Sequence, residues 1–591
     1  MPDAIDKAWV VCLEIKRIQT WLFSVPKLQP MVGANAILAK LMEKTLPHLA
    51  VAKGAALPVA DRTCGEKAPA WIAGDHLASW DDPLNKKTDP ILVRQAGRFH
   101  AVFVTEDAAK QFARAAAQAI GDACGDVRVQ CEIEALECRS GAWRCTGKVA
   151  IAEVAISGGG NAVFESSLLQ PCEASGLGVA AHRVGGRNGA RKLRVSADVI
   201  RRQNAFGDHE AAKGEDCDLV KRFYQGVNKL GGYRQPNDFS DLADGGYLAV
   251  LCADGNGVGA GRADAEGNKD DDYFARWRRT EAYFLRTRSR IRAALATALA
   301  DTKGLINKKE TLVRYRMLML GGDDILLVCR ADRVLELASK LSQALDAINA
   351  SGEASASTTI GIGIAIVHPK FPFRRAHELA EALMASAKKR SRSQTCVDWE
   401  VVTAAALPDL QALRHAQWVT GGDAGVAAIA SLRPYPGHVL AQMVEKAQKL
   451  VPEEVGADLD RGARIGRGQW RRLAEQTLRG MFLGELAKRE LRPTARTEID
   501  AAVKAVANIW AGAPQPPKPH GTCDHWYPIG AADAPVAWGT PLLDLIEVAH
   551  IHTLGSRGVA HDDLQAEETE AGKGAAVGGA LGDTPDQVGA A

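Results

Sequence analysis

Apolar and polar positions along the chain predict an alternation of strands and helices from the first residues onward. Residues 9–15 form a short, largely apolar run that predicts a strand, and a helix that begins near Ile18 follows it. In this first unit the pattern predicts strands at 9–15, 91–94, 99–104, 127–133 and 148–156, and helices from Ile18, over 34–46 and over 108–124. We therefore expect a mixed α+β domain over residues 1–157.

A second unit of similar order begins at Tyr247. Its pattern predicts strands at 247–253 and 358–367, helices at 273–299, 331–348 and 376–389, and a hairpin centred on residues 321–324. Read in order this is β-α-ββ-α-β-α, and it predicts a second domain over residues 246–400.

The remaining segments differ in character. Residues 158–245 open with three glycines and hold few long apolar runs, which favours a small linker domain. Residues 401–560 are mainly helical by period. The last segment, 561–591, is expected to be a disordered acidic tail, because its final 30 residues hold seven acids and one lysine.

Composition excludes several protein classes. With 591 residues, 46% hydrophobic and 24% charged, the chain can bury several cores. No apolar run approaches the roughly 18 residues of a membrane span, and no secretory segment opens the chain, so we expect a cytoplasmic protein without a membrane partner. The net charge of +2 gives no overall attraction to nucleic acid.

Local charge and cysteine patterns leave alternatives open. Residues 182–202 carry seven Arg or Lys against one acid, which suits either a phosphate contact or a solvated loop. The arginines over 276–292 suit RNA or triphosphate contact as well as an exposed helix face. Cysteines recur every seven residues from Cys124 to Cys145, but no CxxC pair occurs, so free thiols are expected.

Acidic residues gather where apolar strands of the second unit end. Gly321 and Gly322 suit a tight hairpin turn, and Asp323 and Asp324 follow them directly. Asp254 ends the strand over 247–253. If these strands are neighbours, the acids converge into an oxygen site of the kind that Mg²⁺ prefers.

These residues carry a resemblance. The runs that carry it are Ala249 to Gly259, Leu320 to Leu326, Thr359 to Pro372, Ala376 to Lys389 and, near the N-terminus, Ile18-Gln19-Thr20-Trp21-Leu22-Phe23-Ser24 with Val32-Gly33-Ala34-Asn35. Together they resemble the large palm-domain subunit of type III CRISPR effector complexes, a family related to GGDEF nucleotidyl cyclases. The resemblance spans residues 8 to 400. It implies an α+β fold class: two ferredoxin-like palm domains, a small linker domain and a helical C-terminal domain.

The resemblance also implies an activity, namely joining ATP into cyclic oligoadenylate with loss of pyrophosphate. By position, Asp254, Asp323 and Asp324 would hold two Mg²⁺ or Mn²⁺ ions, and Gly321 and Gly322 would let the nucleotide approach the backbone. Lys388 would touch the triphosphate. Guide RNA and other effector subunits are the implied partners, with target RNA as activator.

The chain departs from the family pattern in three places. No HD nuclease motif precedes the palm-like sequence, so DNA cleavage is not expected, and His561-Asp562 is expected to be a solvated pair. Asn256 stands where many members have a second acid, although its carbonyl can still bind a cation. Cys172 lies where the family often has a cysteine ribbon, but it has no CxxC partner.

Two other functions stay open from the sequence. One is a catalytically silent palm that binds guide RNA and partner subunits, which the intact acids argue against because an acidic cluster without a task is repulsive. The other is a diguanylate cyclase, which Ile325 after the acid pair and the missing sensor domain argue against. His368, at a strand end before Pro369, is expected to be a turn or packing residue.

Overall fold

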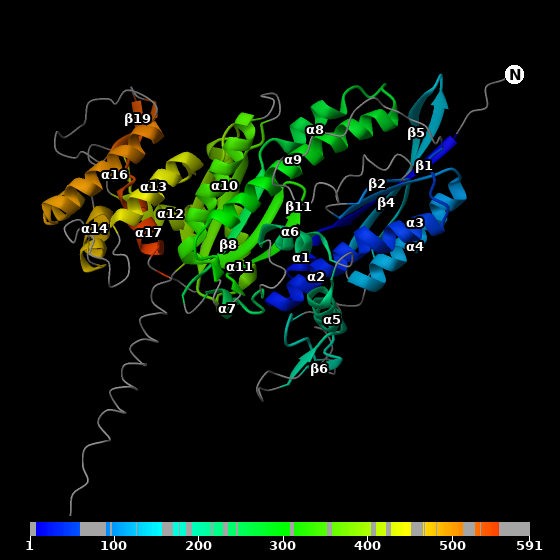
Figure 1. The fold of residues 1–591 in the computed structure, drawn as a ribbon, viewed down its shortest axis with the longest axis horizontal. Coiled ribbons are helices and arrows are strands. Elements are labelled where there is room, and N and C mark those ends of the chain that lie inside the picture. Colours follow the sequence, from blue (N-terminus) through cyan, green and yellow to red (C-terminus); the bar gives the residue numbers. More distant parts are fainter. Residues whose placement is uncertain are drawn as a thin grey trace, which may run out of the picture.

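The computed structural model shows two sheet-centred domains side by side, a helical end beyond the second, and a small linker below (Figure 1). It describes residues 7–554 except for 59–89, 95–96, 126, 156–169, 177, 185–191, 214–216, 229–233, 244–245, 308–311, 352–356, 403–408, 421–426, 451–464, 466, 480, 512–525, 532–533 and 553. The predicted acidic tail and His561-Asp562 lie outside the described residues.

The first domain is an antiparallel five-stranded sheet in the order β2-β3-β1-β4-β5. Its strands are β1 (Lys7–Lys16), β2 (Ile91–Val93), β3 (Arg98–Phe103), β4 (Arg128–Arg139) and β5 (Ala142–Ala155). One face buries alternate residues of β1, namely Val11, Leu13 and Ile15. The helices of this domain are α1 (Ile18–Leu22), α2 (Leu28–Lys40), α3 (Leu46–Ala52) and α4 (Glu106–Cys124), and the π-helical turn η1 (Leu41–Thr45) joins α2 to α3.

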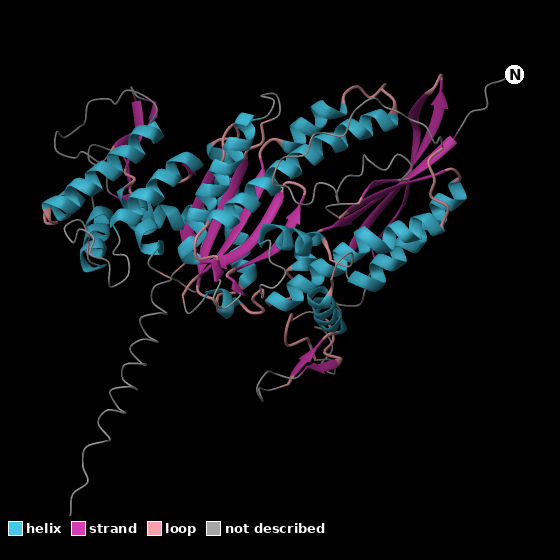
Figure 2. Ribbon diagram, viewed as in Figure 1, coloured by secondary structure: helices cyan, strands magenta, loops and turns pink. Residues whose placement is uncertain are grey.

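The second domain is a six-stranded sheet in the order β11-β12-β8-β13-β14-β17. Its strands are β8 (Leu248–Gly255), β11 (Tyr315–Gly321), β12 (Asp324–Arg330), β13 (Ile360–Val367), β14 (Cys396–Val401) and β17 (Tyr435–Pro436). Its helices are α8 (Val258–Glu266), α9 (Tyr273–Asp301), α10 (Ala331–Ser351) and α11 (Phe373–Arg390), and the short strands β9 (Ile306–Asn307) and β10 (Leu312–Val313) form a separate pair. Figure 2 shows the helices packed around this sheet.

Helices cover both faces of the second sheet. Leu251 of β8 packs with α9 and α10 in one core, whereas Val250 and Cys252 face a second core that α11 shares with the first domain. Helix α11 lies close to β13 because residue 363 is glycine: a Cβ there would stand 2.1 Å from the carbonyl oxygen of Ala380. The shared core makes the two domains neighbours in one packed unit.

The two sheets have one topology. In each, the second and third strands in sequence form one edge, the first strand comes next and the fourth follows it. This is the ferredoxin-like order, and it confirms the predicted fold class of two palm-like domains. The sequence pattern missed α8 and β14, which follow the expected strand 247–253 and helix 376–389 respectively.

The linker packs a short hairpin and three helices beneath the palms: β6 (His182–Val184), β7 (Leu193–Val195), α5 (Ala197–Ala211), α6 (Leu219–Asn228) and α7 (Phe239–Ala243). Val195 of this hairpin is buried against Val25, Cys172 and Val199, and Val184 and Leu193 pack against the same cluster. Arg183 and Arg201 are exposed or half-exposed, as the basic segment predicts, but Arg202 is fully buried and is no surface contact. Arg187 and Arg191 lie outside the described residues.

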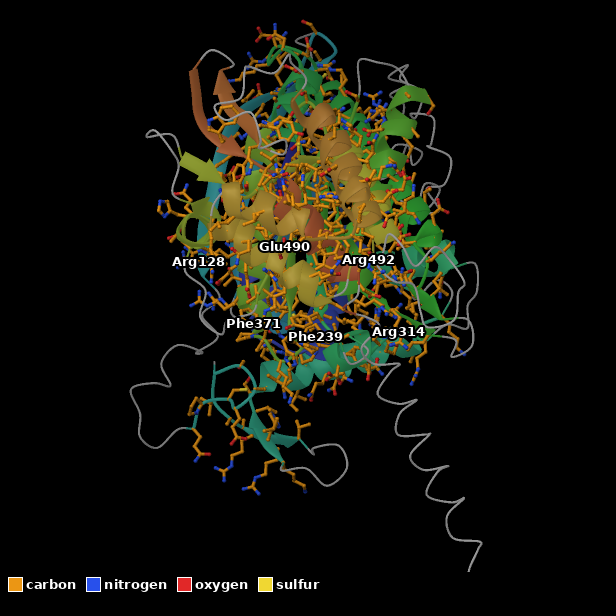
Figure 3. All side chains as sticks on the ribbon, turned by 90° about the vertical axis from the view of Figure 1, so that its left-hand side faces the viewer. Arg128, Phe239, Arg314, Phe371, Glu490 and Arg492 are labelled. Carbon is orange, nitrogen blue, oxygen red and sulfur yellow. The ribbon has the colours of Figure 1, made fainter. Side chains whose placement is uncertain are left out.

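The C-terminal part is helical as expected, but it also carries strands. Its helices are α12 (Leu410–Trp418), α13 (Gly437–Leu450), α14 (Arg467–Arg479), α15 (Met481–Arg489), α16 (Pro493–Ala511) and α17 (Leu542–His552). A four-stranded sheet joins β15 (Val419–Thr420), β16 (Ala427–Ile429), β18 (Tyr527–Ala531) and β19 (Ala534–Gly539). Glu490 and Arg492, after α15, mark this end in Figure 3. Among the described helices, none is long and apolar enough to cross a membrane.

Candidate active site

The three predicted acids meet at one end of the second sheet. Strand β12 pairs with β8 so that Ile325 lies opposite Ala253, which places Asp324 beside Asp254. Gly321 pairs with Asp324, so Gly322 and Asp323 form a two-residue turn, and the φ of +62° at Gly322 suits such a hairpin. One carboxylate oxygen from each acid lies within 4.8 Å of the others.

Burial and mutual repulsion set the protonation of this triad. Burial, together with the charge of Asp254, raises the pKa of Asp323 to about 6. Burial and the hydrogen bond with Asp254 raise the pKa of Asp324 to about 8. Burial also disfavours a charged Asp254, but hydrogen bonds from Asp324 and Lys388 outweigh it and hold the pKa of Asp254 below its usual value. The triad therefore shares protons at neutral pH unless another positive charge joins it.

Lys388 is a positively charged residue that already lies beside the triad. Its ammonium group pairs with Oδ2 of Asp254 and donates a hydrogen bond of 2.9 Å to the carbonyl oxygen of Gly255. The residue lies in the last turn of α11, which the close packing on β13 brings over the strand ends. The lysine expected to touch a triphosphate thus lies beside the acids, and its contact with phosphate stays a prediction.

Asn256 anchors the loop after β8. Its Nδ2 donates to Oγ1 of Thr359 at 3.0 Å and to the carbonyl oxygen of Gln394 at 3.5 Å. Because the hydroxyl of Thr359 itself donates to the carbonyl oxygen of Arg392, it must accept from Asn256, which fixes the orientation of the amide. The Oδ1 atom of Asn256 is buried and has no hydrogen-bond partner among the described residues.

Open space surrounds the glycines of the turn. A Cβ added at Gly321 or Gly322 would meet no heavy atom within 4 Å. Of these two residues, only Gly322 has a positive φ, so the backbone requires glycine at one of them. Gly321 leaves the backbone of the turn accessible, which is consistent with the predicted approach of a nucleotide.

A cavity of about 1290 Å³ opens beside the triad, between the two palms. Asp323 and Asp324 line it from the second palm, and strands β1 and β3 line it from the first. Typical pockets for a single small ligand measure roughly 300–1,000 Å³. The cavity therefore has room for more than one nucleotide.

The first palm presents basic residues to the same cavity, at positions that sequence reasoning missed. Lys16 is the last residue of β1 and Arg17 follows it, at the strand end that corresponds to Asp254 of β8. Arg94 follows β2 and Arg98 begins β3, so both lie at the hairpin that corresponds to the acidic hairpin of the second palm. Glu14 pairs with Lys16 at 2.5 Å and with Arg98 at 3.6 Å. The sequence contained a hint of these positions. When the two predicted units are aligned strand by strand, the segment from Arg94 to Arg98 corresponds to the acidic turn of the second unit.

The arginines of α9 form no exposed helix face, contrary to one of the two expectations. Arg288, Arg290 and Arg292 are buried, whereas Arg286 is exposed. Arg276 pairs with Glu266 of α8 and lines the cavity together with Arg288 and Arg292. The helix thus contributes positive charge to the cavity rather than to the outer surface.

The other candidate residues have structural surroundings. Nδ1 of His368 accepts a hydrogen bond from the backbone of Lys370, and its ring packs against Tyr247, so the prediction of a turn residue is confirmed. Within the described chain, the acidic triad is the one cluster of His, Cys, Asp or Glu with metal-holding geometry. Cys172 of the linker and the cysteines spaced by seven belong to no such cluster.

Comparison with known families bears on this site. The family described as Cas10/Cmr2, second palm domain, matches residues 247–396. This segment is a Cas10/Cmr2 second palm domain. It contains the triad, both glycines and Lys388, and the match confirms the family resemblance predicted from the sequence.

Solved structures show a weak likeness that covers most of the chain. Csm1 of T. onnurineus is 13% identical, with 86% of this chain and 70% of that chain covered and a TM-score of 0.44. An apo Csm1-Csm4 cassette is 13% identical over 93% and 70% of the two chains, with a TM-score of 0.44. A Csm1-Csm4 cassette in complex with cA4 is 12% identical over 86% and 70%, with a TM-score of 0.42. No curated protein matches the chain.

Proposed function

We propose that this chain is a nucleotidyltransferase that joins ATP into cyclic oligoadenylate in RNA-guided antiviral defence. The observation that carries the proposal is the convergence of Asp254, Asp323 and Asp324 beside a large cavity that Asp323 and Asp324 line, within a segment that matches the Cas10/Cmr2 second palm domain. A palm without catalytic work would gain nothing from a repulsive acidic cluster in a half-buried position.

The donor set fits divalent cations. Hard carboxylate oxygens are the ligands that Mg²⁺ and Mn²⁺ prefer, and Oδ1 of Asn256 is a further acceptor without a partner in the described chain. Burial and the neighbouring carboxylates raise the pKa values of Asp323 and Asp324 even though Lys388 lies beside them, which supports a need for further positive charge. When bound there, such cations would supply activation of a 3′ hydroxyl and charge neutralisation at the leaving pyrophosphate.

The residues of the chain itself orient the reactants. Asp323 and Asp324 project from a short turn whose glycines leave the backbone open, so a nucleotide can approach closely. Lys388 holds Asp254 in place and offers a positive charge next to the acids. Phosphoryl transfer depends mainly on such positioning and charge stabilisation, and it leaves little covalent work to the protein.

The first palm would hold the phosphates of a second nucleotide. Lys16, Arg17, Arg94 and Arg98 line the cavity, with Glu14 as the acid that pairs with two of them. Guanidinium groups bind phosphate oxygens well because they form paired, charge-assisted hydrogen bonds. Joining two ATP molecules requires one at each side, and the cavity has room for both.

The expected partners belong to this proposal as well. Guide RNA, target RNA as activator and other type III effector subunits are inferred from the family resemblance. The exposed basic residues Arg183 and Arg201 of the linker are suited to a phosphate backbone.

The direct test is incubation with each of the four labelled nucleoside triphosphates and Mg²⁺, with and without guide and target RNA. We expect ATP to be consumed with release of pyrophosphate and formation of cyclic oligoadenylate, and we expect excess EDTA to stop the reaction. The reason is that triphosphate and three carboxylates repel one another without a cation. Turnover that persists in EDTA would contradict the metal site. RNA and subunit binding without any nucleotide turnover would instead favour the silent scaffold.

A further inference from the structure

The hairpin that carries two of the acids lies at the free edge of the second sheet. Strand β11 pairs with β12 on one side and is the last strand of the sheet on the other. Its ladder with β12 is irregular between Met317 and Met319. Because an edge strand is held by one ladder only, contacts outside the sheet must help to set the position of the turn.

One such contact is an ion pair between a buried arginine of β11 and a partly exposed glutamate of the linker. Arg316 of β11 is 2% exposed, and its Nη2 donates to Oε1 of Glu210, at the C-terminal end of α5, over 2.8 Å. Its guanidinium also lies 5.8 Å from the ring centre of Phe206 on the same helix. Its Nη1 is buried and makes no hydrogen bond with the described residues. Glu210 is therefore the carboxylate that compensates this buried charge.

Helix α5 is a firm support for this pair. Arg202, about two turns before Glu210, donates to the carbonyl oxygens of Trp21 and Leu22 and stacks on the ring of Trp21. Gly33 of α2 lets the helices touch, because a Cβ there would stand 1.8 Å from the carbonyl oxygen of Arg202. The N-terminal half of α5 is therefore fixed to the first palm, and its C-terminal end contacts β11.

The C-terminal end of α5 is fixed as well. Lys221 of α6 donates to the carbonyl oxygens of His209 and Glu210 at 2.6 and 2.8 Å. Asp218 accepts from the backbone of Lys221 and pairs with Nδ1 of His209 at 2.7 Å. These bonds satisfy the last carbonyls of the helix and hold the backbone of Glu210 in place.

We infer that Arg316 and Glu210 are positioning residues for the acidic hairpin, so that the linker belongs to the catalytic unit rather than serving as a spacer. Arg316 lies five residues before Gly321 on the same strand. A strand anchored there transmits the position of α5, and through it that of the first palm, to the turn that holds Asp323 and Asp324. The inference rests on the proposed function for its catalytic consequence, but the position of the hairpin can be measured without it.

The test uses Glu210→Gln, Arg316→Gln and Arg316→Lys in the full chain, with its partner subunits if activity needs them. Asp208→Asn is the matched control, because Asp208 is an exposed acid on α5 two residues before Glu210. Three quantities are measured: the kcat and KM for ATP, hydrogen exchange of the amides over residues 317–325, and the midpoint of thermal unfolding.

We expect both Gln variants to lower kcat about tenfold with KM for ATP within twofold, since the binding cavity stays while the acids shift. Exchange over residues 317–325 should accelerate at least fivefold while β8 and β13 stay protected. Arg316→Lys should recover most of kcat, and Asp208→Asn should behave as the unaltered chain.

Unchanged hydrogen exchange in the hairpin of Glu210→Gln would overturn the inference, whatever the activity. So would an unchanged kcat in an active protein whose thermal midpoint alone has fallen, because that is the mark of a structural pair. If the unaltered chain turns over no ATP, the proposed function fails, and the exchange measurement still decides the inference. If Arg316→Gln does not fold, Glu210→Gln decides it, since the side chain of Glu210 is 39% exposed.

Discussion

The two palms share a strand order but differ in charge at the same place. In the second palm, β8 and the β11–β12 turn end in Asp254, Asp323 and Asp324, with Lys388 as the balancing cation. In the first palm, the corresponding ends carry four basic side chains and Glu14 as the balancing acid, and these residues line one cavity together with Asp323 and Asp324. The basic residues are Lys16, Arg17, Arg94 and Arg98.

The difference supports the proposal that the two copies of one fold have different tasks. The ferredoxin-like order brings the end of its first strand next to the hairpin of its second and third strands, whatever residues stand there. Acids at that place suit cations, and arginines suit phosphates. Arg17, with a φ of +55°, lies in a conformation that is uncommon for residues other than glycine, as is typical of positions held for function.

The largest effect is expected from the acidic side. Replacing Asp323 and Asp324 together by Ala should reduce product formation at least roughly a hundredfold, the scale of losing a principal electrostatic contributor. Folding should persist, and the thermal midpoint should not fall, because the two buried acids repel each other and Asp254. Pyrophosphate release measures product formation, and circular dichroism measures folding and the thermal midpoint. Near-normal synthesis would mean that the turn is only a turn.

A smaller effect is expected from the basic side. Replacing Arg94 and Arg98 by Gln should raise the KM for ATP about tenfold, the equivalent of one lost charge-assisted hydrogen bond of about 1.5 kcal/mol. The kcat at saturation should change less, since the acids are untouched. Arg139→Gln is the control, because Arg139 is an exposed arginine in the β4–β5 hairpin. Equal KM values for the double variant and the control would break the proposed division between the palms.

The smallest effect concerns β14 of the second sheet. This strand pairs parallel with β13, whereas the strands of the first sheet pair antiparallel. Glu400 of β14 is 2% exposed, its Oε2 makes no hydrogen bond with described residues, and burial raises its pKa to about 7 although Arg433 opposes the shift. A raised folded-state pKa means that stability falls as the pH rises from about 4.5 to about 7.

Glu400→Gln removes that penalty, so it should increase the free energy of unfolding by about 1–3 kcal/mol at pH 8 and by little at pH 5. Urea unfolding at both pH values measures it. Glu475→Gln, at an exposed glutamate, is the control. A gain that is equal at both pH values would show that the charge of Glu400 is not its source.

The acidic site could be predicted from the sequence because each of its residues lies in a strongly patterned segment. Strands 247–253, 314–320 and 325–329 are largely apolar, and the glycines mark the turn between the last two, so Asp254, Asp323 and Asp324 stand out. The basic counterpart was harder to predict. Arg94 and Arg98 are ordinary surface residues until the strand order of the first sheet is known.

Burial and long-range pairing were the least predictable features. The basic run over 182–202 includes Arg202, whose burial depends on the carbonyl groups of α1 about 180 residues away. The pair of Arg316 with Glu210 joins residues 106 positions apart, and no local pattern signals it. Sequence periodicity reports one helix or strand at a time, whereas such contacts depend on how these elements pack.

The proposal that the second palm holds cations and the first palm holds phosphates is tested most directly by Mn²⁺ binding. The affinity for Mn²⁺ is measured by electron paramagnetic resonance in three proteins. The unaltered chain and the Arg94→Gln, Arg98→Gln double variant should bind Mn²⁺ alike, because the acids that hold the ion are the same in both. The Asp323→Ala, Asp324→Ala double variant should lose at least tenfold in affinity, since two of the three carboxylates are gone. Equal Mn²⁺ affinity in all three proteins would contradict the account, because the acids of the second palm would then not be the ligands.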